Sequence, residues 1–219
     1  LYDRHTGAAG YSPEASSMAG RALRNVALGY LAAGLQGGQL QTLLLEHYAN
    51  ADNLTDRRAA LAELVEAPSL DESVRQETLA AFYERWQNEA LVVDLWFSLQ
   101  AASELCDVQA LLQLEAHAAF DARNPNKLRA VYGAFAQRNH RNFHALNGSG
   151  YEFLADRVID LNATNPQIAA RLLGPLTRWQ RYDSKRQALM RQALQRIEDA
   201  GGLSKDVFEV VRKSLAPPS

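Results

Sequence analysis

Apolar residues recur along most of this chain at the spacing of an α-helix. Between residues 14 and 34 they lie three or four positions apart, at Ala19, Ala22, Leu23, Val26, Ala27, Tyr30 and Leu31. Residues 184–200 repeat the pattern with Leu189, Met190, Ala193, Leu194 and Ile197. Such spacing places one apolar stripe on each helix, and we expect each stripe to be buried against a neighbouring helix.

Capping and turn residues divide the chain into about eleven expected helices. Three pairs place a capping side chain before a proline at the first helical position, and they are Ser12-Pro13, Asn124-Pro125 and Asn165-Pro166. The tetrapeptide Ser69-Leu70-Asp71-Glu72 matches a capping box, in which Glu72 reaches back to Ser69. The expected helices span residues 14–34, 38–49, 55–66, 70–87, 89–101, 104–117, 125–138, 149–163, 166–173, 183–200 and 204–215.

Composition agrees with an all-α fold. Ala and Leu, which favour helices, are far more frequent than the β-branched residues that a sheet requires. Short helices joined by short connections predict an α-solenoid of the HEAT or armadillo type, and a compact irregular bundle is the alternative. We expect a single domain over 1–219, in which residues 1–11 serve as a linker from a preceding domain and 216–219 as a loose tail.

Charge and cysteine content exclude several classes of protein. Lys and Arg number 23 against 25 Asp and Glu, so the chain lacks the basic excess of a dedicated nucleic-acid binder. The single cysteine, Cys106, excludes a disulfide framework and fits a reducing compartment, which predicts a cytoplasmic protein. No apolar run approaches the roughly 18 residues of a membrane-spanning helix. The chain begins without Met or a signal-peptide pattern, and we expect an excised or processed fragment.

The sequence offers little catalytic chemistry of its own. His140 and His144 have the i, i+4 spacing of a zinc site, but Arg141 stands where the zincin motif HExxH requires a Glu. We therefore expect a loop with polar packing there and no metal site in this chain. The turn Gly148-Ser149-Gly150 lacks the other glycines and the Lys of a phosphate loop, and Ser149 is the expected helix cap.

Three further features have simple structural interpretations. Cys106 lies in an expected helix and predicts a buried thiol. The aromatic side chains of residues 82–101, including Trp96, are expected to lie in the core, with a ligand groove as the alternative. The basic residues Arg178, Arg181, Lys185, Arg186 and Arg191 predict a solvated helix face.

Several longer stretches resemble the C-terminal helical domain of the bacterial aminopeptidase N family. They are GRALRNVALGYL (20–31), YANADNLTDRRAAL (48–61), FYERWQNEALVVDLWFSLQA (82–101), NPNKLRAVYGAFA (124–136) and FHALNGSGYEFLADRVIDLNATNPQIAARLLGPLTRWQRYDSKRQ (143–187). The similarity runs in order from about residue 11 to residue 216. Its most specific parts are NPNKLR, the NGSGY turn and the segment around NPQ.

The resemblance implies a domain without an active site. The family comprises zinc aminopeptidases whose HExxH motif lies in a preceding catalytic domain, and no such motif occurs here. It implies that this chain caps the catalytic cavity, admits peptides with a free N-terminus and excludes folded proteins. The zinc then belongs to the catalytic domain of the longer protein, which is also the intramolecular partner of this chain, and the isolated fragment is expected to be inactive.

The resemblance also points to substrate contacts at Gln167 and Arg171. In the family, the helix that begins at the NPQ segment faces the substrate cavity. The i, i+4 spacing independently places both side chains on one helix face near its N-terminus, where a hydrogen bond or a carboxylate contact would suit them. The alternative is that Arg171 pairs with a nearby acid and Gln167 lies on the surface. Arg129, after NPNKL, is a weaker candidate for the same surface.

A second function remains open from the residues alone. A free-standing helical-repeat adaptor that binds a protein partner would have the same composition and the same periodicity.

Overall fold

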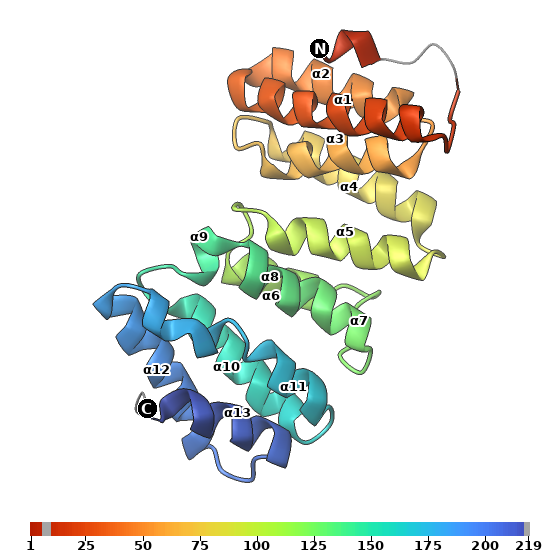
Figure 1. Cartoon of the computed structure of the whole chain (residues 1–219). Helices are drawn as coiled ribbons and strands as arrows, with labels where there is room; N and C mark the ends of the chain where they lie inside the picture. Colours follow the sequence, from red (N-terminus) through yellow and green to blue (C-terminus); the bar gives the residue numbers. More distant parts are fainter. Residues whose placement is uncertain (6–9, 217–219) are drawn as a thin grey trace. The chain divides into compact units, whose positions relative to one another are not determined.

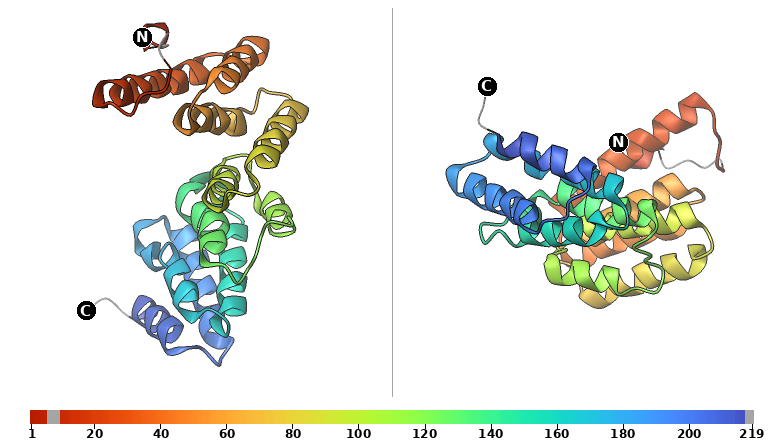
Figure 2. Two further views of the ribbon diagram at one scale, coloured as in Figure 1. Left: turned by 90° about the vertical axis from the view of Figure 1, so that its right-hand side faces the viewer. Right: turned by 90° about the horizontal axis from the view of Figure 1, so that it is seen from below.

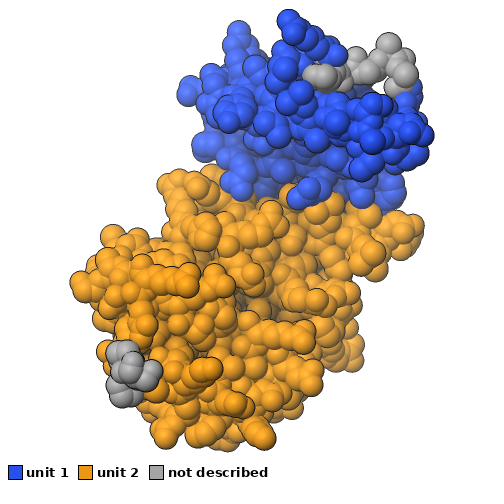
Figure 3. All heavy atoms as spheres, viewed as in Figure 1, with its two compact units in different colours: residues 1–87 blue, residues 88–219 orange. Residues whose placement is uncertain are grey.

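The computed structural model describes residues 1–5 and 10–216, in which helices are joined by turns and irregular connections and no strand occurs (Figure 1). The prediction of an all-α fold is confirmed. The chain forms two compact units, Leu1–Gln87 and Asn88–Ser219, which Figure 3 shows in different colours. A single domain over 1–219 stays a prediction, and the expected tail at 217–219 lies outside the described residues.

The first unit contains four long helices. After a 3₁₀ turn, η1 (Asp3–His5), come α1 (Ala15–Gly34), α2 (Gly37–Asn50), α3 (Leu54–Glu66) and α4 (Glu72–Trp86). Its core is a leucine-rich cluster that α1, α2 and α3 share with the α3–α4 connection, namely Leu28, Leu40, Leu44, Ala60, Leu64, Ala67 and Leu70. Tyr2 packs against this cluster and its hydroxyl lies 2.7 Å from His47 Nδ1. Part of the expected linker is therefore held by the unit, and residues 6–9 lie outside the described chain.

A polar network attaches α1 to α3. Asn25 donates a hydrogen bond of 2.9 Å to Asp56 Oδ1, and the Arg24 guanidinium lies 3.5 Å from Asp56 Oδ2. Asp56 is almost fully buried, so these contacts satisfy a charge that would otherwise be costly. Polar residues of α1 therefore face inward beside Leu28, which is fully buried in the core cluster.

The apolar stripe predicted for residues 14–34 is consequently misplaced. Of its members only Ala27 is buried, whereas Val26 is 57% exposed and Tyr30 79% exposed. The stripe predicted for 184–200 is confirmed, since Met190, Ala193, Leu194 and Ile197 are buried and Leu189 is half-buried. Periodicity identified the helix correctly in both cases, but it could not reveal that the inner side of α1 is formed by Leu28 together with the polar residues Arg24 and Asn25.

The second unit contains the remaining helices. They are α5 (Ala90–Ala102), α6 (Val108–Glu115), α7 (Pro125–Leu128), the π-helical turn η2 (Arg129–Gly133), α8 (Ala134–Arg138), α9 (His140–Phe143), α10 (Ser149–Asn162), α11 (Pro166–Leu172), the 3₁₀ segment η3 (Leu176–Arg181), α12 (Ser184–Asp199) and α13 (Lys205–Leu215). Within each unit, helices that are close in sequence lie side by side (Figure 2). Buried aromatic rings, including Phe97, Phe135, Phe143 and Tyr151, fill the core of this unit.

Most expected helices are present with small shifts at their ends, and three regions differ. The helix expected at 104–117 begins only at Val108, where the side chain of Asp107 accepts a hydrogen bond from the backbone of Ala110. The loop expected at 139–148 contains the single turn α9, and 174–182 contains η3. These short helices have too few residues to show a helical period.

The predicted caps gave mixed results. Asn124 caps α7 as expected, because its side chain accepts a hydrogen bond from Asn126 N. The capping box at Ser69 is wrong, since α4 begins at Glu72 and this Glu contacts Arg75 instead. The helix expected to start at Pro13 starts at Ala15.

Candidate functional site

The helix α11 places Gln167 and Arg171 on one side. Its buried residues Ile168, Ala169 and Leu172 pack toward α10 and α13, so the two polar residues project from the opposite side and both are exposed. Their i, i+4 spacing brings the amide and the guanidinium to neighbouring positions on that surface. The structure thus brings together the two residues that the sequence singled out.

Arg171 has no acidic partner within ion-pair distance among residues 1–5 and 10–216. The alternative in which it forms a structural ion pair inside this chain therefore loses its support. An exposed guanidinium with no partner of its own is available to bind a carboxylate or a carbonyl oxygen.

Arg129 lies in a separate hollow of the second unit. This hollow is lined by residues of α5 and of the α7–α8 segment, namely Leu91, Asp94, Leu95, Ser98, Asn126, Arg129, Ala130 and Arg138. Arg129 itself is held by its neighbours, because it donates to the Pro125 carbonyl and to Asn126 Oδ1. No hydrogen bond between described residues joins Arg129 to Gln167 or Arg171.

The π turn explains how Arg129 and Arg138 come to line one hollow. Each residue of an α-helix advances by about 100°, so positions nine apart would face opposite sides. A π turn holds about one residue more than an α turn, which brings the two arginines nearer to the same side. Sequence reasoning missed Arg138 because no residue pattern announces such a turn.

The charge of this hollow is positive on balance. Asp94, its one carboxylate, is neutralised by Lys127, whose Nζ lies 2.6 Å from Asp94 Oδ1. Lys127 is almost fully buried and also lies over the Phe97 ring. The remaining charges at the hollow are those of Arg129 and Arg138, which favour an anionic or carbonyl-bearing group.

Of the two histidines, His144 lies in a packed polar cluster and His140 is exposed. The imidazole of His144 is buried between two phenols, with Nδ1 2.8 Å from the hydroxyl of Tyr151 and Nε2 3.0 Å from that of Tyr182. Burial lowers the pKa of His144 to about 4, and His140 and Arg186 act in the same direction. Both ring nitrogens of His144 are thus engaged by protein groups. In the described part of the chain, no three His, Cys, Asp or Glu side chains gather as a metal site would require.

The Gly148-Ser149-Gly150 turn has a structural explanation. Gly148 has a φ of 77°, which disfavours other residues, and it precedes α10 in place of the expected Ser149 cap. A Cβ at Gly150 would lie 2.5 Å from the Phe143 carbonyl oxygen, so only glycine permits this approach of α10 to α9. The turn therefore joins two helices closely.

The other expected core features are present. Cys106 is buried, and so are Phe82, Trp96 and Phe97 from the aromatic stretch. Trp96 contacts Phe97 edge to face and also lies against His117. The interpretation as core is confirmed for these three aromatic residues, whereas Tyr83 and Trp86 of the same stretch are half-buried.

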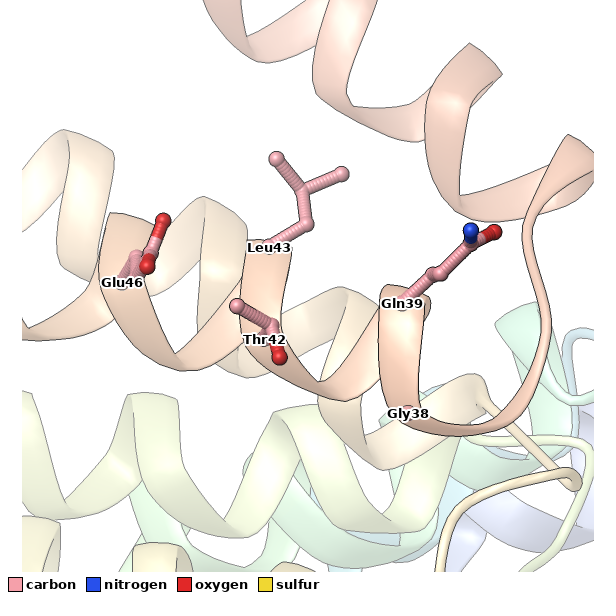
Figure 4. Close-up of a pocket in the computed structure, with 5 residues that line it drawn as sticks. All are labelled: Gly38, Gln39, Thr42, Leu43 and Glu46. Atoms are coloured by element: carbon pink, nitrogen blue, oxygen red, sulfur yellow. The ribbon is translucent and has the colours of Figure 1, made fainter.

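Two further hollows offer fewer groups that could act together on a ligand. The hollow in Figure 4 follows one side of α2 and is lined by Gly38, Gln39, Thr42, Leu43 and Glu46. Another lies between α10 and α12 around Glu152, Gln192 and Arg196. In the first, all lining groups come from one helix and do not converge on a point, and in the second Arg196 is already paired with Asp156. Neither resembles a catalytic site.

No helix within the described ranges combines the length and the apolar character needed to cross a bilayer.

Comparisons with known proteins identify the relatives of this chain. It is 44% identical over 206 residues to an aminopeptidase N of Haemophilus influenzae and 40% identical over 207 residues to an aminopeptidase N of Escherichia coli. Each match covers 94% of this chain and 23% of the relative, so the chain spans about a quarter of the length of these curated relatives. The resemblance to a C-terminal part of aminopeptidase N is confirmed.

A solved structure and a family model agree with this result. The crystal structure of Legionella pneumophila aminopeptidase A in complex with aspartic acid matches with a TM-score of 0.86 and 30% identity, over 98% of this chain and 26% of that one. A family model described as a domain of unknown function, DUF3458_C, ARM repeats, matches residues 1–216. The armadillo-type α-solenoid expected from helix length and number is thereby confirmed, and the chain belongs to the DUF3458_C family of ARM-repeat domains.

Proposed function

We propose that this chain is the C-terminal helical domain of a longer metallo-aminopeptidase that removes N-terminal residues from peptides. The observation that carries the proposal is the alignment of 94% of the chain with 23% of aminopeptidase N. The low cysteine content supports a cytoplasmic location for that protein.

In this proposal the chemistry takes place outside the chain. The described residues supply no ligand set for a metal, and both ring nitrogens of His144 are occupied by Tyr151 and Tyr182. The zinc of the parent enzyme therefore belongs to its catalytic domain, and the role of this chain is to cap the catalytic cavity and restrict access to it. A stacked repeat array suits that role, because its exposed side chains can vary without disturbing the core.

Gln167 and Arg171 are the proposed substrate contacts. Both are exposed on one side of α11, and Arg171 lacks an acidic partner in the described chain. The guanidinium would hold a carboxylate or a peptide oxygen of the substrate, and the Gln167 amide would bond a carbonyl or a side chain. Arg129 and Arg138, in their positive hollow, form a second and weaker candidate surface.

The test replaces Arg171 by Ala in the full-length parent enzyme. A well-formed charge-assisted hydrogen bond contributes about 1.5–3 kcal/mol, so kcat/KM should fall about tenfold to a hundredfold. The loss should depend on peptide length, because chemistry at the zinc is untouched. Arg58→Ala is the matched control, since Arg58 is also an exposed helical arginine, in the first unit.

Two outcomes would contradict the assignment. Unchanged kinetics on short and long peptides would remove Arg171 from the substrate path. A lower melting temperature with all substrates affected alike would make it a structural residue.

A free-standing adaptor remains the second candidate, and the gene distinguishes the two. The peptidase proposal requires several hundred further codons upstream that encode an HExxH motif. An open reading frame that begins near Leu1 would favour the adaptor.

A further inference from the structure

Basic residues are concentrated between residues 171 and 191, in the second unit. This stretch holds six of the 23 Lys and Arg residues of the chain and one of its 25 Asp and Glu residues, Asp183. Its formal charge is therefore +5, whereas the whole chain carries −2. The acidic residues that offset this charge lie elsewhere in the sequence, so positive charge is locally in excess.

The structure leaves most of this charge without an acidic partner. Asp183 is already paired, because its Oδ2 lies 2.7 Å from Nη1 of Arg186. Four other basic residues are exposed, namely Arg178, Arg181, Lys185 and Arg191. None of these four forms an ion pair with a residue that the structure describes. Their charges are therefore available to an anionic group from outside this stretch.

The four residues belong to two elements that pack together. Arg178 and Arg181 lie in η3, one turn of a 3₁₀ helix apart. Lys185 lies in the first turn of α12, which packs against η3. The guanidinium of Arg191, further along α12, lies 5.1 Å from the centre of the Trp179 ring in η3. The positive charges are thus gathered on η3 and the first half of α12, which together are called the η3–α12 surface.

The chemistry of the η3–α12 surface favours carboxylates over nucleic acid. Three of its four cations are arginines, whose planar guanidinium offers two parallel donors to a carboxylate. Surfaces that hold single-stranded nucleic acid also need free aromatic rings on which bases stack. Here Trp179 is covered by Arg191 and donates to the Ser214 carbonyl oxygen at 3.1 Å, and Tyr182 stacks on His144 with ring centres 4.4 Å apart. Both rings of this stretch are therefore engaged within the unit.

We propose that the η3–α12 surface binds acidic polypeptide segments through the carboxylates of neighbouring Asp and Glu residues. Side chains on one side of an extended peptide are about 7 Å apart, so a run of acidic residues can reach several of the cations at once. Each exposed ion pair contributes little alone, and binding should therefore require several acidic residues and weaken with salt. The inference rests on the proposed function in one respect, the choice of a polypeptide as the anionic ligand.

The test measures peptide binding to the full-length protein of the parent gene by fluorescence anisotropy. The probe is a fluorescein-labelled oligo-Glu peptide with an acetylated N-terminus, which leaves no free amine for an aminopeptidase to act on. An oligo-Gln peptide of the same length reports binding that does not depend on charge. Arg178→Gln combined with Arg181→Gln removes two charges from the surface. Arg4→Gln combined with Arg58→Gln is the matched control, because it removes two charges from exposed positions of the first unit.

Oligo-Glu should bind the natural protein at least about tenfold more tightly than oligo-Gln, and added salt should reduce the difference. The loss of Arg178 and Arg181 should weaken oligo-Glu binding about fivefold to thirtyfold, whereas the control pair should change it less than about twofold. Equal binding of the two peptides would overturn the proposal. An equal loss in the two double variants would also overturn it, because net charge and not this surface would then be the cause.

A labelled oligo-U RNA with the same number of charges tests the other class of polyanion. Weaker binding of this RNA than of oligo-Glu is the expected result. Tighter binding that is lost in the Arg178 and Arg181 double variant would make this a nucleic-acid surface and would overturn the proposal. The measurement involves no hydrolysis, so failure of the peptidase assay leaves it unaffected and the two proposals can fail separately.

Discussion

A single amide, that of Asn139, holds the turn between α5 and α6. The fully buried Nδ2 lies 3.3, 2.5 and 2.8 Å from the carbonyl oxygens of Ala101, Ser103 and Cys106, while Oδ1 accepts from Asn142 N. The expectation of polar packing around 139–148 was correct in kind. The sequence could not predict the three carbonyl groups that accept from Asn139, because they lie more than 30 positions away.

The candidate site shows the same limit. The outward positions of Gln167 and Arg171 could be predicted, because Ile168, Ala169 and Leu172 define the buried side of a short helix. The positions of Asp94 and Arg138 in one hollow could not be predicted, because the hollow depends on a contact between two helices and on a π turn.

The burial of His144 predicts a pH-dependent stability. Its pKa is about 4 in the folded chain against 6.5 for an exposed histidine, so the folded state favours the neutral ring. The stabilisation is complete above pH 6.5 and is lost as the pH falls toward 4, because only the unfolded chain then binds the proton. The effect is on the order of 3 kcal/mol at most.

Urea denaturation from pH 7 to pH 4 measures this effect. The free energy of unfolding should fall with pH more steeply for the natural chain than for His144→Gln, which has no titrating group at this position. Parallel profiles for the two proteins would show that His144 does not contribute.

At the scale of elements, local signals were sufficient for most helices. Prolines, glycines and apolar periods placed α2, α3, α5, α10 and α12 within one or two residues of their observed bounds. Which side of a helix is buried was harder to predict from the sequence. The stripe of α1 was recognised as apolar, but the inner side of the helix instead carries Leu28 with Arg24 and Asn25. The two polar residues contact Asp56, whose burial no local pattern reveals.

The junction between α9 and α10 predicts a sharp requirement for glycine. In Gly150→Ala the new methyl would lie 2.5 Å from the Phe143 carbonyl oxygen and 2.7 Å from Phe143 Cα, both backbone atoms that cannot turn aside. The free energy of unfolding should fall by about 1–3 kcal/mol, as expected for overpacking. Chemical denaturation of the second unit measures it.

Gly174→Ala provides the control for this variant. Its Cβ would meet the Arg171 carbonyl oxygen at 3.4 Å, an ordinary contact. If both variants lost the same stability, the close approach at Gly150 would not be the cause.

At the scale of the whole molecule, helix number and length were enough to predict a repeat array. The individual repeats were not visible in the sequence, because stacking tolerates many different apolar residues at each interface. The division into two compact units was not expected either, since no linker-like composition marks the boundary near Gln87.

The lack of gathered metal ligands among the described residues predicts that the isolated chain is inactive. The purified 219 residues should bind no zinc stoichiometrically and hydrolyse no aminoacyl amide, because the described residues bring no metal ligands together. Metal analysis and a chromogenic amide assay test this. One tightly held zinc per chain, lost when His140 and His144 are changed together, would contradict it.

The π turn at Arg129–Gly133 has a consequence for how this family can vary in length. Because the turn holds about one residue more than an α turn, deleting one residue there restores an ordinary helix and leaves the flanking segments facing as before. A deletion within a regular α-helix such as α10 or α12 would rotate every later side chain of that helix by about 100°. Homologues that lack one residue within the continuous helical segment 125–138 should therefore have their gap between Arg129 and Gly133, and their inward and outward faces should otherwise be the same.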